Sequence, residues 1–197
     1  MLFAAGKGTR MGDLTKDRPK PMVEVAGKPL IDHALQIANA ADVGPIVVNL
    51  HYLPQLLKAH LSGQGIVFSD ETDGLLETGG GLRKALPLLC SNPVLTMNTD
   101  AVWNGPNPIE TLKNAWQPQM EALLLLVKKQ NVSGHLGAGD FGINAEGHLH
   151  RAPDLIYTGV QIIRTDVLSE ITEDAFSMNL AWDIIGKRNG LFGAVYD

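Results

Sequence analysis

The sequence predicts an α/β domain in which helices cover both faces of a mostly parallel central sheet. Two observations favour this class. Through the first half of the chain, short apolar segments alternate with segments whose apolar residues recur at helical spacing, a pattern typical of βα units. The first apolar segment, residues 1–5, runs directly into a glycine-rich turn at residues 6–8, as a strand that ends at a ligand-binding loop does.

The first half contains the clearer elements. Leu30, Ala34, Ile37 and Ala41 share one helical face, which predicts a helix over residues 30–41. The continuous apolar run 46–50 suits a buried parallel strand. We further expect strands at 66–69 and 94–97 and helices at 54–61 and 78–89.

The second half is less regular. The apolar run 122–127 predicts a central strand. Residues 134–147 are rich in glycine and turn formers, and they precede expected strands at 148–151 and 156–163. Helices are expected at 166–171 and 179–187, and a last strand at 192–196. No internal repeat or linker interrupts the chain, so we predict one domain over residues 1–197.

Composition excludes several classes of protein. The net charge is −5 and no basic block occurs, which argues against binding of duplex nucleic acid. The one cysteine, Cys90, cannot form an internal disulfide, and its apolar neighbours predict that it is buried. No apolar run is long enough for a transmembrane helix, and no leader pattern precedes the first strand. We therefore expect a cytoplasmic protein without a membrane partner.

The glycine-rich loop predicts a site for a polyphosphate. Glycines let backbone N–H groups come close to an anion, and the cations Arg10 and Lys20 follow the loop. The spacing matches neither a P-loop, which needs Gly-Lys-Ser/Thr after four residues, nor a dinucleotide fingerprint, since Met11 stands where a glycine is required. A plain turn with surface cations is the alternative.

Further candidates follow other predicted strands. Asp100 ends the string Asn-Thr-Asp after strand 94–97; it suits Mg²⁺, although a turn cap is the alternative. Asn49 and His51 at the end of strand 46–50 could pair with a base or satisfy local backbone. Because ligands of open α/β sheets bind beyond the carboxyl ends of strands, we expect one crevice to be formed by the loops after five residues: Ala5, Leu50, Ser69, Met97 and Ala138.

Three glycines open the predicted helix 78–89. Each glycine costs a helix roughly 1 kcal/mol relative to alanine, so the string Glu77-Thr-Gly-Gly-Gly81 predicts close approach of a base or ribose to the backbone, or else a flexible helix entry. The six histidines show no spacing typical of zinc ligands. Ser/His/Asp, Cys/His and paired-carboxylate hydrolytic patterns are also missing from the sequence.

The segment from Ala4 to Pro21 resembles the signature of the sugar-1-phosphate nucleotidyltransferases. Ala-Ala-Gly-Lys-Gly-Thr-Arg at residues 4–10 and Pro-Lys-Pro at 19–21 match that signature in type and spacing. Leu-Glu-Thr-Gly-Gly-Gly at 76–81 and Gly-Asp-Phe at 139–141 are similar to the branch of N-acetylmuramate-1-phosphate uridylyltransferases. The resemblance covers nearly the whole chain. It implies a three-layer α/β/α, Rossmann-like nucleotidyltransferase fold.

The resemblance also implies a reaction and its residues. A sugar-1-phosphate would attack the α-phosphorus of a nucleoside triphosphate, here UTP, and pyrophosphate would leave. Arg10, Lys20 and Asp100 would be catalytic, with Asp100 holding Mg²⁺. The nucleotide would contact Ala4, Ala5, Gly6, Gly8, Thr9, Asn49, Glu77 and Gly79, in a half spanning about residues 1–118. The sugar, N-acetylmuramate 1-phosphate, would contact Gly139, Asp140, Thr158 and Gly159, in a half spanning about 119–197.

One family feature is missing from the sequence. A second metal-binding aspartate follows a Trp-x-Asp-Val-Gly-type string in this family, and the chain contains no such string, so it looks truncated at its C-terminus. A mannose-1-phosphate guanylyltransferase, a glucose-1-phosphate thymidylyltransferase and a non-catalytic module that binds a nucleotide-sugar remain as alternatives. The sequence does not decide the oligomeric state, and a homodimer stays open.

Overall fold

The computed structural model describes all residues 1–197 and divides into two compact units. Unit 1 comprises Met1–Ser91, Met97–Gly105 and Thr172–Met178, and unit 2 comprises Asn92–Thr96, Pro106–Ile171 and Asn179–Asp197. Each unit is described by itself below. None of the helices is both long and apolar enough to cross a membrane.

Unit 1 is built on parallel strands. Strand β1 (Leu2–Phe3) pairs with β4 (Val47–Leu50) on one side and with the end of β6 (Val94–Asn98) on the other, and β4 pairs in turn with β5 (Val67–Asp70). All three pairings are parallel. Every residue of β4 is buried, as its continuous apolar sequence predicts.

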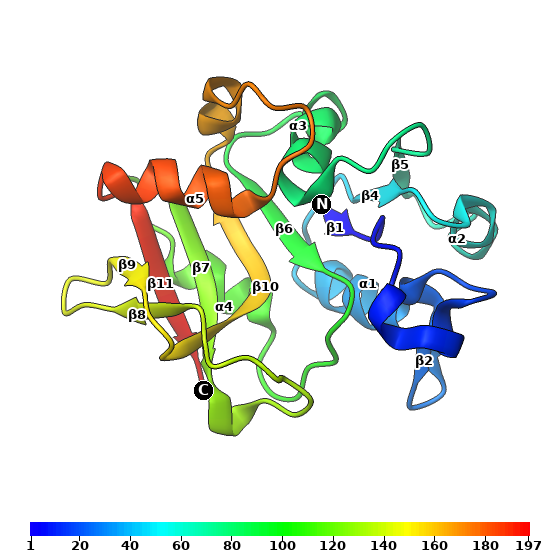
Figure 1. The fold of residues 1–197 in the computed structure, drawn as a ribbon, viewed down its shortest axis with the longest axis horizontal. Coiled ribbons are helices and arrows are strands. Elements are labelled where there is room, and N and C mark those ends of the chain that lie inside the picture. Colours follow the sequence, from blue (N-terminus) through cyan, green and yellow to red (C-terminus); the bar gives the residue numbers. More distant parts are fainter. The chain divides into compact units, whose positions relative to one another are not determined.

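The connections of unit 1 explain its layers. Helices α1 (Leu30–Ala40) and α2 (Pro54–His60) join β1 to β4 and β4 to β5, whereas α3 (Glu77–Leu89) returns from β5 to β6. Crossovers between parallel strands are almost always right-handed, so connections that run in opposite directions along the sheet put their helices on opposite faces. Figure 1 accordingly shows α1 and α3 on the two sides of β1.

Short elements complete unit 1. The glycine-rich loop leads into the 3₁₀ segment η1 (Thr9–Thr15), which Gly12 interrupts, and then into η2 (Lys20–Met22). A small antiparallel hairpin of β2 (Glu24–Val25) and β3 (Lys28–Pro29) follows. The segment Thr172–Met178, which is distant in sequence, packs against the start of α3.

Unit 2 is centred on the buried strand β7 (Ala122–Lys128). It pairs in parallel with β11 (Leu191–Tyr196) and antiparallel with β10 (Leu155–Ile163). A hairpin of β8 (Phe141–Ile143) and β9 (Leu149–Arg151) joins β10. Helices α4 (Pro108–Ala115) and α5 (Met178–Lys187) and the 3₁₀ segments η3 (Lys129–Asn131) and η4 (Thr165–Glu170) complete the elements.

The fold class is confirmed, with four local corrections. Helix α4 and strand β8 were not expected from the sequence, and the expected helix 166–171 is the 3₁₀ segment η4. Cys90 is exposed instead of buried. It follows the last residue of α3 in a left-handed conformation (φ 51°), where the chain turns away from the helix and its thiol reaches only the Pro87 carbonyl.

Candidate active site

Unit 1 contains a cavity of about 490 Å³ at the carboxyl ends of its parallel strands. Its walls come from the loop after β1, the start of η2, the end of β4, the segment before and at the start of α3, and the end of β6. Ten of the predicted residues line it: Ala4, Ala5, Gly6, Gly8, Thr9, Arg10, Lys20, Asn49, Glu77 and Asp100. The neighbouring Lys7 of the loop lines it as well. Five stretches of chain thus converge on one pocket.

The glycine-rich loop has a fixed shape. Gly8 adopts a left-handed conformation (φ 65°), and a Cβ there would lie 2.8 Å from Thr15 Cγ2. The Gly8 carbonyl accepts hydrogen bonds from Met11 N (2.9 Å) and from the Thr15 hydroxyl (3.0 Å). The backbone N–H groups of Gly6 and Lys7 make no hydrogen bond within the protein. They leave donors for an anion in the pocket.

A buried amide holds the residues that precede this loop. Asn49 is only 2% exposed, and its Oδ1 accepts hydrogen bonds from Ala4 N (2.6 Å) and Ala5 N (3.3 Å). Its Nδ2 donates to Glu71 Oε1 at 2.8 Å. Asn49 lines the pocket, yet its amide is engaged with the protein itself. This geometry supports the local-backbone interpretation of Asn49 over direct contact with a base.

Glu71 is a residue that the sequence analysis missed. It is fully buried and follows β5 directly. Besides Asn49, its carboxylate accepts from Leu76 N at 3.4 Å. Burial raises the pKa of the Glu71 carboxyl, and the hydrogen bonds from Asn49 and Leu76 oppose that shift.

Two charged residues that line the pocket form an ion pair. Lys20 Nζ lies 2.6 Å from Asp100 Oδ2, with 25% and 40% of the two side chains exposed. The Thr99 hydroxyl donates to Phe3 O at 2.8 Å, and so ties the end of β6 to β1. Arg10 is exposed at the pocket and has no ion-pair partner. Its guanidinium is therefore available to a bound anion.

The glycines of α3 serve packing. Gly79 is buried and does not line the pocket. A Cβ at this position would overlap the Phe176 ring. Gly79 N and Gly80 N donate to Phe176 O at 2.8 and 3.2 Å. The Thr78 hydroxyl accepts from Met178 N at 3.0 Å. Close approach of backbone does require these glycines, but the approaching group is the segment Thr172–Met178.

The four predicted sugar residues lie in unit 2. Asp140 Oδ2 accepts from Tyr157 N (2.9 Å), and the Thr158 hydroxyl donates to Leu125 O (2.8 Å). Gly139 and Gly159 have positive φ values of 138° and 86°, which explains glycine at both positions. None of these four residues lines the pocket of unit 1, and their role in sugar binding stays a prediction.

Metal ligands are few. No group of three or more His, Cys, Asp or Glu side chains could hold an ion, so a site made by protein ligands alone is not present. Asp100 nevertheless offers one half-exposed carboxylate in a pocket suited to phosphates. Magnesium is commonly held by one or two carboxylates together with substrate phosphates, and Asp100 fits that role.

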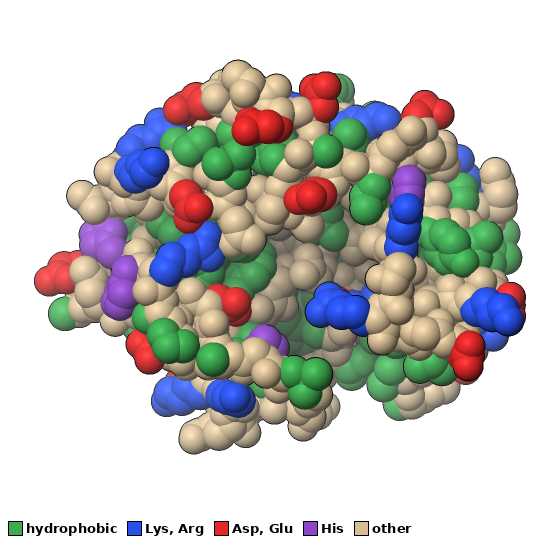
Figure 2. All heavy atoms as spheres, viewed as in Figure 1, with side chains coloured by type: hydrophobic (Ala, Val, Ile, Leu, Met, Phe, Trp, Pro, Cys, Tyr) green, Lys and Arg blue, Asp and Glu red, His purple; other side chains and the backbone are tan.

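Surface charge is mixed. On the face drawn in Figure 2, Lys and Arg side chains are scattered among acidic and apolar ones and form no continuous basic patch. The space-filling view of this face thus agrees with the modest net charge of the sequence.

Comparisons with known proteins identify the family. Residues 1–157 match the MobA-like NTP transferase domain. The chain is 40% identical over 198 aligned positions to an N-acetylmuramate alpha-1-phosphate uridylyltransferase of Caulobacter vibrioides, covering 92% of this chain and 81% of the relative. It is 35% identical over 114 positions to a mannose-1-phosphate guanyltransferase of Gibberella zeae, covering 54% and 31%.

The fold has clear structural relatives as well. HddC from Yersinia pseudotuberculosis, solved in complex with GMP-PN, superposes with a TM-score of 0.79 at 21% identity and covers 99% of this chain and 88% of HddC. At that identity the likeness concerns the fold alone. Together with the matched domain and the 40% identical relative, it leads to one conclusion: the chain belongs to the sugar-1-phosphate nucleotidyltransferases with a MobA-like NTP transferase domain.

Proposed function

We propose that this enzyme transfers a uridylyl group from UTP to N-acetylmuramate 1-phosphate. The observation that carries the proposal is the 40% identity to a uridylyltransferase of that specificity over 92% of the chain. The pocket of unit 1 supports it, because an exposed glycine-rich loop with free N–H groups and two cations suits a nucleoside triphosphate.

In the proposed reaction an oxygen of the sugar phosphate attacks the α-phosphorus. The bond between that phosphorus and the bridging oxygen to the β-phosphate breaks, and pyrophosphate leaves with the electron pair. No covalent enzyme intermediate is needed, since the attacking phosphate is already a nucleophile. The protein contributes positioning and stabilisation of charge.

The two cations have separate tasks in this proposal. Arg10, exposed and without an ion-pair partner, binds the departing β- and γ-phosphates. Lys20 is less exposed than Arg10 and lies beside Asp100, and its charge reduces the repulsion between the α-phosphate and the incoming phosphate. The guanidinium of Arg10 can donate two hydrogen bonds at once to the oxygens of the β- and γ-phosphates, whereas the ammonium of Lys20 acts as a compact charge between the α-phosphate and the incoming phosphate.

Magnesium is the metal that the proposal requires. Asp100 would supply one oxygen ligand, and water and phosphate oxygens would supply the others. When bound, Mg²⁺ would neutralise charge on the phosphates. Lys20, now paired with the Asp100 carboxylate, would then be released toward the substrates.

Another nucleotide is the second candidate. The relative from Gibberella zeae is a mannose-1-phosphate guanyltransferase. The match to the guanyltransferase covers only 54% of this chain, which makes uridylyl transfer the better supported reaction. A module that binds a nucleotide-sugar without turnover is the remaining alternative.

Release of pyrophosphate tests these proposals together. The purified chain is incubated with Mg²⁺, with each of UTP, dTTP, GTP, ATP and CTP, and with N-acetylmuramate 1-phosphate, mannose 1-phosphate or glucose 1-phosphate. We expect the fastest release with UTP and N-acetylmuramate 1-phosphate. A preference for GTP would replace the proposed base, and binding of UDP-sugar without any release would favour the non-catalytic module.

A further inference from the structure

A buried pair of side chains connects two walls of the pocket. Asn49 holds Ala4 N and Ala5 N, which begin the glycine-rich loop, and it donates to Glu71. Glu71 in turn accepts from Leu76 N, between the pocket residues Leu75 and Glu77. Glu71 itself does not line the pocket. The pair therefore contacts both walls, with Asn49 at the edge of the cavity and Glu71 outside it.

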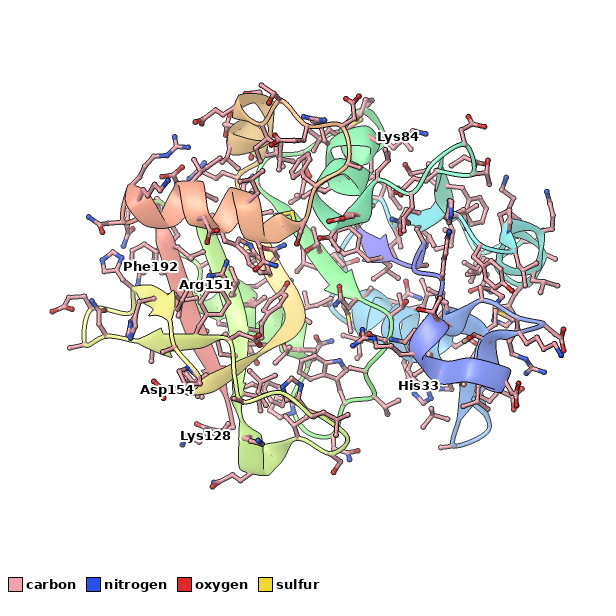
Figure 3. The ribbon with its side chains drawn as sticks, viewed as in Figure 1. His33, Lys84, Lys128, Arg151, Asp154 and Phe192 are labelled. Atoms are coloured by element: carbon pink, nitrogen blue, oxygen red, sulfur yellow. The ribbon has the colours of Figure 1, made fainter.

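The surrounding residues leave the pair room and place no cation in contact with it, although the charges of Lys84 and His51 lower the pKa of Glu71 and so partly oppose the effect of burial. A Cβ at Gly81 would lie 2.7 Å from Glu71 Oε1 and 3.2 Å from Asn49 Nδ2, so glycine is needed at that position of α3. Lys84, labelled on α3 in Figure 3, donates its ammonium to the carbonyl of Asp70 and not to the Glu71 carboxylate. A fully buried carboxylate without a contacting cation is a costly choice for stability alone.

We infer that Asn49 and Glu71 are positioning residues that set the spacing between the glycine-rich loop and the Leu75–Glu77 segment, and thereby the fit of the nucleotide. The inference deepens the proposed function and rests on its assignment of this pocket to the nucleoside triphosphate. Glu71 does not line the pocket, and the amide of Asn49, although it borders the pocket, is engaged with Ala4, Ala5 and Glu71. The pair therefore acts on the nucleotide through the backbone groups that it holds.

The direction of the central hydrogen bond gives a direct test. With Glu71→Gln, the new amide has only one acceptor oxygen for two donors, Asn49 Nδ2 and Leu76 N. With Asn49→Asp, a new carboxylate faces the Glu71 carboxylate. In the double variant Asn49→Asp/Glu71→Gln, the amide at position 71 donates to the carboxylate at 49. Its oxygen still accepts from Leu76 N, and the second carboxylate oxygen still accepts from Ala4 and Ala5. The net charge is unchanged.

Amide hydrogen exchange is the first measurement, since it needs no turnover. In each single variant, the backbone amides of Ala4, Ala5 and Leu76 should exchange faster by about tenfold or more, as expected when a buried hydrogen bond is lost. The double variant should return to within about threefold of the parent protein. Unchanged exchange rates in both single variants would overturn the inference, whichever substrates the enzyme uses.

Steady-state kinetics, well below the unfolding temperature, is the second measurement. Each single variant should raise KM for the nucleoside triphosphate by about tenfold, while KM for the sugar phosphate should change by less than about twofold. In the double variant, KM for the nucleoside triphosphate should return to the value of the parent protein. Equal loss for both substrates would indicate general destabilisation and overturn the positioning role. A parent protein without turnover would contradict the proposed function, and the exchange data would still decide the inference.

Unit 2 offers a matched control. Asn92 Oδ1 accepts from Thr165 N (2.9 Å), and its Nδ2 donates to Asp166 Oδ2 (2.8 Å) on the surface. Asn92→Asp therefore makes the same chemical change in the same type of pair, at a residue that does not line the pocket. We expect it to leave KM for the nucleotide and exchange at Ala4, Ala5 and Leu76 unaltered. An effect equal to that of Asn49→Asp would overturn the inference.

Discussion

At the scale of single residues, the contact between Lys20 and Asp100 links the two kinds of charge that the reaction needs. The 2.6 Å ion pair occupies one oxygen of the only carboxylate in the pocket that is close to a cation. A divalent ion at Asp100 would compete with the ammonium for that oxygen. Binding of metal and release of Lys20 toward phosphate would then occur together.

Removal of either pocket cation should slow the reaction. We expect Arg10→Ala and Lys20→Ala each to lower kcat/KM by about two decades, because each loses a charge aimed at the transferring phosphates. Lys58→Ala is the control, since Lys58 pairs with Asp70 on the surface of the same unit. A variant that stays within about threefold of the parent enzyme would have no part in the mechanism.

Asp100→Asn should abolish turnover that depends on Mg²⁺ while the fold persists. The amide loses the charge that attracts the ion. The ion pair with Lys20 is partly exposed, so its loss should change the free energy of unfolding by less than about 1 kcal/mol. Titration of Mg²⁺ against the initial rate, with thermal unfolding alongside, measures both effects. An unaltered dependence on Mg²⁺ would contradict the assignment.

Charged residues beside the loop could be predicted from the sequence, whereas Glu71 could not. Arg10, Lys20 and Asp100 follow apolar strands and glycines, and their residue types fit phosphate and metal chemistry. Glu71 becomes informative only once β4 and β5 are aligned with Leu50 opposite Asp70. A continuous apolar strand carries no signal for that register, because its side chains are buried whichever partner residue they face.

At the scale of elements, the start of α3 shows that one sequence feature can have two physical explanations. Three glycines at a helix entry indicate close approach of another group. In the structure that group is the segment Thr172–Met178 for Gly79 and Gly80 and the Glu71 carboxylate for Gly81. The helix thus lies close to its neighbours, and its first residues, Glu77 and Thr78, reach the pocket.

The same substitution should have opposite effects in two helices. In Gly80→Ala the new methyl would overlap the Asp174 carbonyl, so we expect a loss of about 1–3 kcal/mol in the free energy of unfolding. In Gly186→Ala, on α5, the nearest atom is Leu191 Cδ2 at 3.9 Å, so helix propensity should yield a gain of up to about 1 kcal/mol. Urea unfolding compares the two variants. A Gly80→Ala protein as stable as its parent would show that the segment Thr172–Met178 can move away.

Elements were predictable where hydrophobic periodicity is strong. Strand β4 and helix α1 lie within a residue of their expected bounds. Helix α4 was missed because it is short and half polar, although Asn107 before Pro108 is a cap signal, and the Asn107 Oδ1 does accept from Ile109 N at 2.9 Å. Strand β8 lies among glycines and pairs in a hairpin whose stability comes from contacts distant in sequence.

At the scale of the molecule, the division into units follows contacts and not the order of the chain. The chain leaves unit 1 after Ser91, returns at Met97 and returns again at Thr172. A linear pattern of apolar and polar residues cannot signal such returns, because each segment resembles any other βα segment locally. The expected boundary near residue 118 therefore stays a functional hypothesis, which substrate-specific kinetics can test.

If unit 1 binds the nucleotide and unit 2 the sugar phosphate, substitutions in each unit should affect one substrate. In Asp140→Asn the side-chain oxygen can still accept from Tyr157 N, as Oδ2 does now, while the charge is lost. Charge-assisted hydrogen bonds to sugar hydroxyls are about twice as strong as neutral ones. We therefore expect KM for the sugar phosphate to rise about tenfold, with KM for the nucleotide unchanged.

The control for that substitution is Asp183→Asn, which removes another exposed carboxylate of unit 2, one paired with Arg151. It should change neither KM by more than about twofold. If Asp140→Asn instead raised KM for the nucleotide, Asp140 would belong to nucleotide binding and the division of labour between the units would be wrong. If it changed neither constant, the carboxylate would serve only the turn before β8, where its hydrogen bond to Tyr157 N already gives it a structural role.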